Sequence, residues 1–416
     1  MPARLLVLSN GHGEDLIALR ILEALHRLRC GLEVSVMPLV GVGSAYEAAE
    51  SEGWLRRIGP RQSLPSGGFS NQSLGGLLAD LHAGLPLLSW HQWRRVRQAG
   101  QERIPILAVG DLLPLLLAWS SGGGFGFVGT PKSDYTWASS PPPGWARSPV
   151  SDRYHRCKGS EWDPWEWAVM GSHRCRLVAV RDQLTARGLR RRGVRACAPG
   201  NPMMDALAPS RPPTEMGQRR RLLLLPGSRM PEALRNLGQL LGALPEGHPG
   251  ITVLIPTGSR PDGEEMAEVM VSHGFRSGAI PLHSHAGAAW RRGDLEVLWG
   301  TGLFSIWAPW AEVALAAAGT ATEQVVGLGI PALSLPGPGP QFTAGFARRQ
   351  SRLLGGAVEP CHSPQQLRQH LLELLDDPEQ RQRRGQTGHR RMGGPGGSER
   401  LAQLISAQLL EGSPGG

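Results

Sequence analysis

A glycine- and threonine-containing turn within residues 316–341, AAAGTATEQVVGLGIPALSLPGPGPQ, carries the clearest chemistry in the chain. Gly319 is followed by Thr320 and Thr322, and Glu323 lies in the first turn of an expected helix. A glycine turn lets backbone N–H groups approach a ligand, and a helix N-terminus favours an anion. The threonine hydroxyls could contact a phosphate, and the carboxylate could accept from sugar hydroxyls. This set suits a nucleotide diphosphate, whereas the structural alternative is an ordinary threonine helix cap.

A second loop with similar chemistry occurs at residues 225–229, LPGSR. It follows an apolar run at 222–225 that is typical of a buried strand. The backbone N–H groups of Gly227 and Ser228, together with the guanidinium fork of Arg229, would form a cradle for phosphate.

Acidic residues and a histidine mark a third candidate site, near the N-terminus. Residues 4–8, RLLVL, predict a buried parallel strand, and a glycine-containing loop then leads into a helix over 16–28. Open α/β sheets bind ligands at the carboxyl ends of their strands, so His12, Glu14 and Asp15 in this loop are candidates. Asp15 could instead cap the helix, whereas His12 between two glycines is hard to explain by packing.

Asp111 follows another predicted strand, at 104–109, and should face the same end of the sheet. It is a candidate base or substrate ligand, and the alternative is an N-cap for a helix over 112–119. A reaction that removes a proton from a hydroxyl needs one base, which His12, Asp15 or Asp111 could supply. The sequence contains no DxD motif and no clustered His or Cys ligands, so we expect no metal.

The chain is basic, because 44 Lys and Arg residues face 35 Asp and Glu residues, for a net charge of +9. Only Lys132 and Lys158 are lysines, so nearly all positive charge is arginine, which suits phosphate and carboxylate recognition. The arginines are scattered and no reader motif occurs, so we expect no nucleic acid as a partner. Five cysteines without a CxxC pair predict free thiols in a reducing cytoplasm.

Membrane contact is expected to be peripheral, because no signal peptide or bilayer-spanning stretch is visible. Residues 74–98 form a long amphipathic pattern in which Trp90 and Trp93 precede Arg94 and Arg95. Such a segment can lie on an anionic membrane surface. The alternative is a core-facing helix with a solvated basic end.

The order of predicted elements divides the 416 residues into two α/β halves, since strand-like runs alternate with helical patterns in both. A proline-rich polar stretch at 208–221 is the predicted linker. We therefore expect an N-terminal domain over 1–207 and a C-terminal domain over 222–392. A last helix and tail at 393–416 could cross back to the N-terminal domain.

Several of these motifs together resemble lipid-A-disaccharide synthase, and more closely the lipid-A-disaccharide-synthase-related proteins. They are LPGSR at 225–229, GTAT with its following glutamate at 319–323, PGNPMMD at 199–205 and the run at 174–194. The resemblance implies a GT-B fold, in which two Rossmann-like doubly wound domains face a central cleft.

That resemblance also implies an activity: inverting, metal-independent transfer of a hexosyl or N-acetylhexosaminyl group from a UDP-sugar to a lipid-linked acceptor. The reaction would take place at the inner membrane face, with the UDP-sugar as a substrate and no cofactor. A homodimer is left open. The implied contacts are Gly227, Ser228, Arg229, Gly319, Thr320 and Thr322 at the diphosphate, Glu323 at the ribose, and Gln341 near the donor sugar or base.

Two other functions are compatible with the same residues. One is a UDP-sugar epimerase, which would act without an acceptor, because a fold does not determine a reaction. The other is a non-catalytic nucleotide-sugar or membrane-binding protein, suggested by Gly11, which stands where the synthase has a glutamate.

Overall fold

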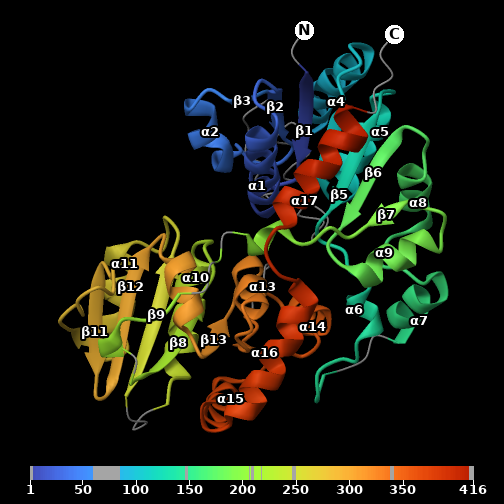
Figure 1. Ribbon diagram of the computed structural model, residues 1–416. Coiled ribbons are helices and arrows are strands. Elements are labelled where there is room, and N and C mark those ends of the chain that lie inside the picture. Colours follow the sequence, from blue (N-terminus) through green and yellow to red (C-terminus); the bar gives the residue numbers. More distant parts are fainter. Residues whose placement is uncertain are drawn as a thin grey trace. The chain divides into compact units, whose positions relative to one another are not determined.

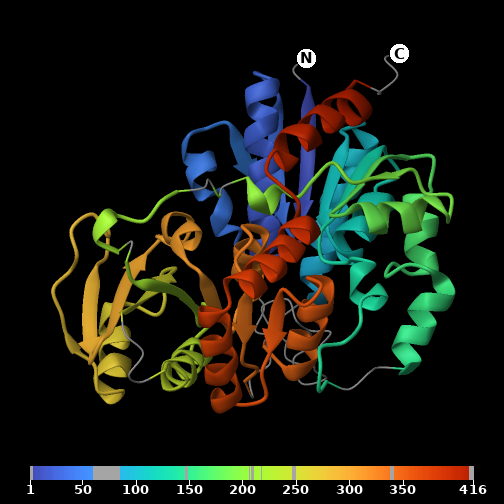
Figure 2. The same ribbon diagram turned by 60° about the horizontal axis from the view of Figure 1, so that its bottom comes forward.

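The computed structural model of the chain contains two compact units (Figures 1 and 2). Unit 1 comprises Met1–Asp134, Arg153–Asp205 and Pro395–Gly416, and unit 2 comprises Tyr135–Asp152 and Ala206–Gly394. The structure describes residues 3–59, 85–145, 149–205, 207, 210–216, 218–245, 250–337 and 342–411, without the side chains of residues 12, 85–88, 149 and 215.

Unit 1 is built on a seven-stranded sheet in which every pair of neighbours is parallel. Its strands are β1 (Arg4–Ser9), β2 (Glu33–Pro38), β3 (Leu55–Arg57), β4 (Ile106–Gly110), β5 (Phe125–Gly129), β6 (Cys175–Val180) and β7 (Ala196–Cys197). Their order is β3-β2-β1-β4-β5-β6-β7, so the chain reverses direction across the sheet between β1 and β4. This is the doubly wound Rossmann order, in which ligands bind at the reversal point.

Helices cover both faces of this sheet, because successive strand residues point to opposite sides. The core on one face joins Leu5 and Val7 of β1 to α1 (His12–Leu28) and α17 (Gly397–Leu404). The opposite face carries Leu6 and Leu8, covered by a second group of helices. These are α4 (Leu85–Gln101), α5 (Leu112–Ser120), α8 (Pro164–Met170) and α9 (Gln183–Arg190).

The PGNPMMD stretch anchors α17 within unit 1. The Asp205 carboxylate accepts hydrogen bonds from three successive backbone N–H groups, those of Gly396, Gly397 and Ser398, at 2.5–3.1 Å. A carboxylate at this position also suits the positive end of the helix dipole. The helix then packs alongside α1 (Figure 1).

Unit 2 is built on an eight-stranded sheet that is parallel except for an added hairpin. Its strands are β8 (Arg220–Leu225), β9 (Ile251–Thr257), β10 (Arg276–Ser277), β11 (Ala288–Arg292), β12 (Leu295–Thr301), β13 (Val313–Ala316), β14 (Ala332–Ser334) and β15 (Val358–Pro360). The order β10-β11-β12-β9-β8-β13-β14-β15 places the reversal point between β8 and β13. The antiparallel pairing of β11 with β10 and β12 was not expected from the sequence.

Six helices longer than one turn accompany this sheet in the described part of unit 2. They are α10 (Glu232–Gly242), α11 (Gly263–Ser272), α13 (Thr320–Gly327), α14 (Ala344–Leu353), α15 (Pro364–Asp376) and α16 (Pro378–Met392). The core is made by strand leucines, such as Leu222 and Leu315, and by apolar residues of α10, α11 and α15.

Residues 135–152 belong to unit 2, although the segments before and after them in the sequence belong to unit 1. Their anchor is Arg352 of α14, which is almost completely buried. Its guanidinium donates to the carbonyl oxygens of Trp137 and Ser139, both at 2.9 Å, and to the Asp152 carboxylate at 2.7 Å. Buried arginine requires such complete pairing.

In the described part of the chain, no helix is both long and apolar enough to span a bilayer.

Candidate functional site

The two predicted phosphate-binding loops of unit 2 lie next to each other. β8 and β13 are paired, and the backbone N–H of Ala317 donates to the Leu225 carbonyl at 2.8 Å. The loops that follow these strands therefore leave the same edge of the sheet at its reversal point. Gly227 has a φ of +95°, and a Cβ there would lie 3.4 Å from the Ala317 carbonyl oxygen. Glycine thus permits both the left-handed turn and the close approach of the loops.

Helix α13 begins at the second of these loops. Gly319 is the N-cap and Thr320 is the first helical residue, so the interpretation of threonine as a helix cap is wrong. No side chain of a described residue caps the N-terminus of α13, and its first residue, Thr320, is exposed. The positive end of the helix dipole is therefore accessible to solvent.

The buried Thr322 hydroxyl stabilises this turn through a hydrogen bond. It donates to the Ala318 carbonyl at 2.7 Å, which occupies its single proton. The Nε2 amide of buried Gln350 donates to the Gly319 carbonyl at 3.1 Å. The structure thus gives Thr322 a role in holding the turn, rather than the phosphate contact expected from the sequence.

The remaining candidates surround the turn with different exposures. Ser228 is exposed, while Arg229 and Glu323 are partly buried. Burial lowers the pKa of Arg229, and the charge of Glu232 opposes this effect. The guanidinium remains a cation at neutral pH. Gln341 lies outside the described residues.

Two supporting residues were missed by sequence reasoning. Asn236 of α10 donates to the Pro226 carbonyl at 3.1 Å and so holds the loop after β8. Its buried Oδ1 has no hydrogen-bond partner among the described residues. Phe346 of α14 is exposed, and its ring lies 3.5 Å from the position of a Cβ on Gly319. The sequence pattern did not indicate either residue as part of the site. Each lies near the loops only because its helix packs against them.

A cluster of polar residues occupies the corresponding reversal point of unit 1. The Asn10 amide after β1 donates to the Asp111 carboxylate after β4 at 2.7 Å. Asp111 also accepts from the backbone N–H of Leu113 at 3.2 Å, so it is the N-cap of α5 as well as a member of the cluster. Burial raises its pKa, and the Leu113 hydrogen bond and the charge of Lys132 act in the opposite direction.

Glu14 is the residue of this cluster whose ionisation is best adjusted for proton transfer. Burial, together with the charges of Asp111 and Asp15, raises its pKa from 4.5 to about 7. Its side chain stays partly exposed, and a Cβ on Gly110 would lie 3.3 Å from its Cγ. A carboxyl with a pKa near neutrality can accept and return a proton. The sequence marked Glu14 as a candidate in this loop but not as a base, because its environment depends on β4.

Asp15 lies inside unit 1 instead of at its surface. Only 1% of the residue is exposed, and its carboxylate accepts from the Ser9 hydroxyl at 2.5 Å. Ser9 in turn accepts from the Tyr46 hydroxyl at 2.9 Å. Burial raises the Asp15 pKa to about 6. α1 begins at His12, so Asp15 is not its cap, and this burial makes it a supporting group rather than a direct base. The His12 side chain lies outside the described residues.

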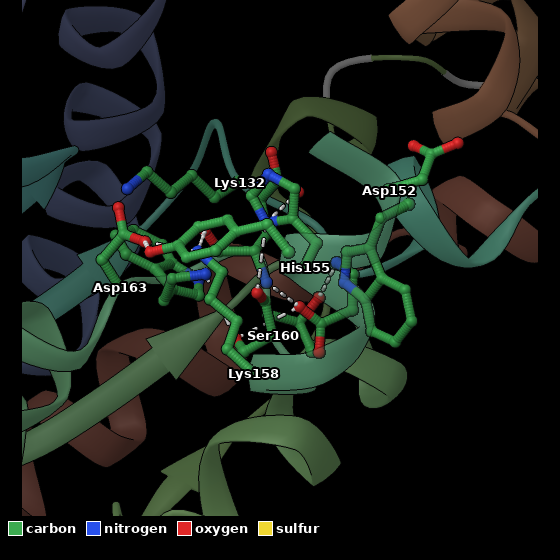
Figure 3. A network of polar contacts seen from close by, with 12 residues as sticks. Lys132, Asp152, His155, Lys158, Ser160 and Asp163 are labelled. Atoms are coloured by element: carbon green, nitrogen blue, oxygen red, sulfur yellow. Dashed lines mark hydrogen bonds and ion pairs between the residues drawn. The ribbon is translucent and has the colours of Figure 1, made fainter. Parts of the chain in front are cut away.

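Both lysines of the chain lie in one polar network of unit 1 (Figure 3). The Lys132 ammonium contacts both oxygens of the buried Glu166 carboxylate at 2.6 Å, and it lies 4.7 Å from the centre of the Trp162 ring. Lys158 pairs with the Asp163 carboxylate. Asp163 and Glu166 form the capping box of α8. This network therefore holds in position Lys132, whose charge opposes the rise in the pKa of Asp111 that burial causes.

The two clusters provide complementary chemistry. Unit 2 offers a cation, glycine-rich turns and a helix N-terminus, which together suit a diphosphate. Unit 1 offers carboxyls with raised pKa values, which suit proton transfer. Among the described residues, no group of three or more His, Cys, Asp or Glu side chains could hold a metal ion.

No protein-family model matches the sequence. The curated proteins contain no match either.

Solved structures do resemble the chain over its full length. The calicheamicin glycosyltransferase CalG4 is 14% identical, with 100% of both chains covered and a TM-score of 0.59. A structure of S. aureus MnaA with UDP is 14% identical, with 98% of this chain and 96% of that chain covered and a TM-score of 0.58. Acinetobacter baumannii MurG is 14% identical, with 98% of this chain and 100% of that chain covered and a TM-score of 0.54.

These similarities, together with the two doubly wound sheets, confirm the predicted fold class: the chain has the GT-B fold, with two Rossmann-like α/β units.

Proposed function

We propose that the chain is a glycosyltransferase that moves a hexosyl or N-acetylhexosaminyl group from a UDP-sugar to a lipid-linked acceptor. The observation that carries this proposal is the meeting of two phosphate-type loops at the reversal point of the unit 2 sheet. Arg229, Gly227 and the N-terminus of α13 supply positive charge and N–H donors on adjacent strands. Reversal points are where doubly wound sheets bind ligands.

In the proposed donor site, the diphosphate binds between the loop at 226–229 and the turn at 317–320. Glu323 in the first turn of α13 accepts from the ribose hydroxyls. Departure of UDP leaves negative charge on the diphosphate, which Arg229 and the helix dipole stabilise. Because these groups supply the positive charge, we propose that the transfer needs no metal.

Unit 1 supplies the base in this proposal. The acceptor hydroxyl loses its proton to Glu14 as its oxygen attacks the anomeric carbon, and the bond from that carbon to the UDP oxygen breaks. Attack from the face opposite the leaving group inverts the configuration. The raised Glu14 pKa supports this assignment over the buried Asp15, with Asp111 as the neighbouring polar partner.

A lipid-linked acceptor and a peripheral location at the inner membrane face remain part of the proposal. They rest on the resemblance to lipid-A-disaccharide-synthase-related proteins and on α4, which overlaps the amphipathic pattern predicted at 74–98. Two similar structures, MnaA with UDP and the Neisseria meningitidis UDP-GlcNAc 2-epimerase with UDP-GlcNAc, support a UDP-type ligand on this fold.

The test is a turnover assay with UDP-GlcNAc, UDP-glucose and UDP-galactose, each with and without membrane lipid extracts. The proposal predicts UDP release that requires both one donor and a lipid fraction, and a glycolipid product detected by mass spectrometry. The absence of any product, although UDP binds, would favour a non-catalytic binding protein.

A UDP-sugar epimerase is the second candidate, because unit 1 holds more than one carboxyl with a raised pKa. Inversion at a sugar carbon requires removal of a proton and its return, so several such groups suit it. The same assay separates the two functions: an epimerase converts the UDP-sugar to its isomer without any lipid, whereas a transferase does not.

A further inference from the structure

Three neighbouring helices of unit 1 carry large apolar side chains into solvent. α5 packs against both α4 and α8 on one face of the sheet (Figure 1). The exposed residues, here called the Trp–Leu face, are Trp90 (54% exposed), Leu113 (43%), Leu116 (38%), Trp119 (42%) and Trp165 (56%). Single exposed apolar residues are normal, but a group on adjacent helices indicates an interaction surface.

The composition of α5 explains this surface. Its sequence, LLPLLLAWS, contains one polar residue, the final serine. Pro114, Leu115 and Ala118 are buried and account for its packing on the sheet. Leu113, Leu116 and Trp119 recur at a spacing of three and therefore lie along one outward side. Each of these three large side chains keeps 38–43% of its surface exposed.

The charge around the Trp–Leu face is positive. Residues 85–101 and 112–120 contain no Asp or Glu. Arg94 and Arg95 of α4 are exposed, and Arg94 is one turn from Trp90. Arg174 borders the face, because it donates to the Trp119 carbonyl at 3.0 Å and lies 5.7 Å from that ring's centre.

The acidic groups at the edge of this face have partners of their own. Asp111 caps α5 and accepts from Asn10. Asp163 at the start of α8 pairs with Lys158.

We propose that the Trp–Leu face docks on an anionic lipid surface, with Arg94 and Arg95 at the phosphate groups of the lipids. This inference extends the proposed function, on which it rests for the idea that the acceptor is a lipid. Exposed leucines with tryptophans and arginines match a headgroup boundary, where tryptophan places its apolar ring inward and its N–H toward water. A second protein copy would bring its own arginines to the same face, so the charge favours lipid.

The test is flotation of the purified full-length chain with two kinds of vesicle, one of phosphatidylcholine alone and one of equal parts phosphatidylcholine and phosphatidylglycerol. We expect binding to the anionic vesicles that weakens between about 0.1 M and about 1 M NaCl. Because each arginine near such a surface contributes about fivefold, Arg94→Gln with Arg95→Gln should weaken binding about 25-fold. Leu116→Gln with Trp119→Gln should weaken it about tenfold or more.

Arg56→Gln with Arg276→Gln is the charge-matched control, since both residues are exposed on edge strands elsewhere. The control should bind anionic vesicles like the unchanged protein. The proposal is overturned if the unchanged protein does not float, or if both surface variants float as it does. It is also overturned if Leu116→Gln with Trp119→Gln converts a dimer into a monomer without affecting flotation.

Titration of the same samples with UDP separates the two proposals. Normal UDP binding without vesicle binding refutes the docking surface alone, whereas vesicle binding without UDP binding refutes the proposed donor site.

Discussion

Glu14 and Asp15 are neighbours in the sequence, yet their carboxyls lie in different surroundings. Glu14 is partly exposed beside Gly110, while Asp15 is buried against Ser9. Consecutive helical residues point about 100° apart, so one can face the sheet edge while the other faces the interior. This difference assigns proton transfer to Glu14 and structural support to Asp15.

Glu14→Gln should abolish most transfer, because the variant cannot accept the hydroxyl proton. We expect UDP release from the active donor and acceptor to fall by about 10² to 10⁴. In the unchanged protein the rate should rise with pH and level off above about 7, where Glu14 is ionised. UDP affinity should not change, and Glu33→Gln, at an exposed position, is the control. Activity of Glu14→Gln within a few-fold of normal would contradict this role.

Asp15→Asn should change how stability depends on pH. Burial raises the pKa of this carboxyl from 3.8 to about 6 in the folded protein. Between these two pH values the folded state binds more protons than the unfolded state, so the free energy of unfolding falls as the pH rises. The two-unit shift corresponds to about 3 kcal/mol. The asparagine side chain still accepts a hydrogen bond from Ser9 but does not titrate. Asp15→Asn should therefore lose this part of the dependence of the free energy of unfolding on pH.

Denaturant titrations between about pH 4 and pH 7 measure the effect. Asp294→Asn, at an exposed position, should keep the normal slope. Equal slopes for the Asp15 variant and the unchanged protein would show that Asp15 is not desolvated.

At the scale of elements, the position of α13 depends on its contact with α16. A Cβ on Gly388 would lie 2.1 Å from a methyl carbon of Val326 and 2.6 Å from its carbonyl oxygen. A Cβ on Gly385 would lie 1.9 Å from the Gly329 carbonyl oxygen. The two glycines thus let the helices pack at backbone distance, which fixes where the α13 N-terminus points.

Gly388→Ala should therefore weaken both stability and UDP binding. Forcing a methyl group into this contact costs about 1–3 kcal/mol, and separation of the helices displaces the Gly319 turn. Gly242→Ala is the matched control, since a Cβ there meets nothing within 4 Å and alanine favours a helix. Thermal unfolding and UDP titration of both variants measure the effect. Equal UDP affinity in the two variants would refute the coupling between α16 and the donor site.

Local signals were enough to predict part of the proposed donor site. The apolar run at 222–225, which forms the end of β8, and the glycine-containing turns at 225–229 and 319–323 were readable without tertiary contacts. The strand β13 before the second turn was not predicted. The direction of individual side chains was not readable. Thr322 is buried two residues after the exposed Thr320, and only the folded turn shows that its hydroxyl donates to the Ala318 carbonyl.

At the scale of the whole molecule, the chain passes between its two units four times, at 134/135, 152/153, 205/206 and 394/395. The proline-rich composition near 208–221 signalled one passage. Residues 135–152 gave no comparable signal, because their place in unit 2 depends on buried Arg352, which is more than 200 residues away in sequence. Contacts of such sequence separation are set by packing and leave no local pattern.

Chelation should leave the proposed reaction unchanged. Arg229 and the α13 N-terminus supply the positive charge in the proposed donor site, so UDP binding and transfer should persist after dialysis against EDTA. Activity that is lost with EDTA and restored by Mg²⁺ or Mn²⁺ would contradict the metal-independent mechanism.

The most direct test of the donor site is calorimetric titration of the full chain with UDP, for the unchanged protein and for two variants. We predict one UDP per chain, and about ten- to hundredfold weaker binding by Glu323→Ala, because a charged acceptor of ribose hydrogen bonds is lost. Glu264→Ala, in the exposed first turn of α11, should bind UDP normally. No UDP binding by the unchanged protein, or equal affinity in Glu323→Ala with its fold intact, would contradict the central claim.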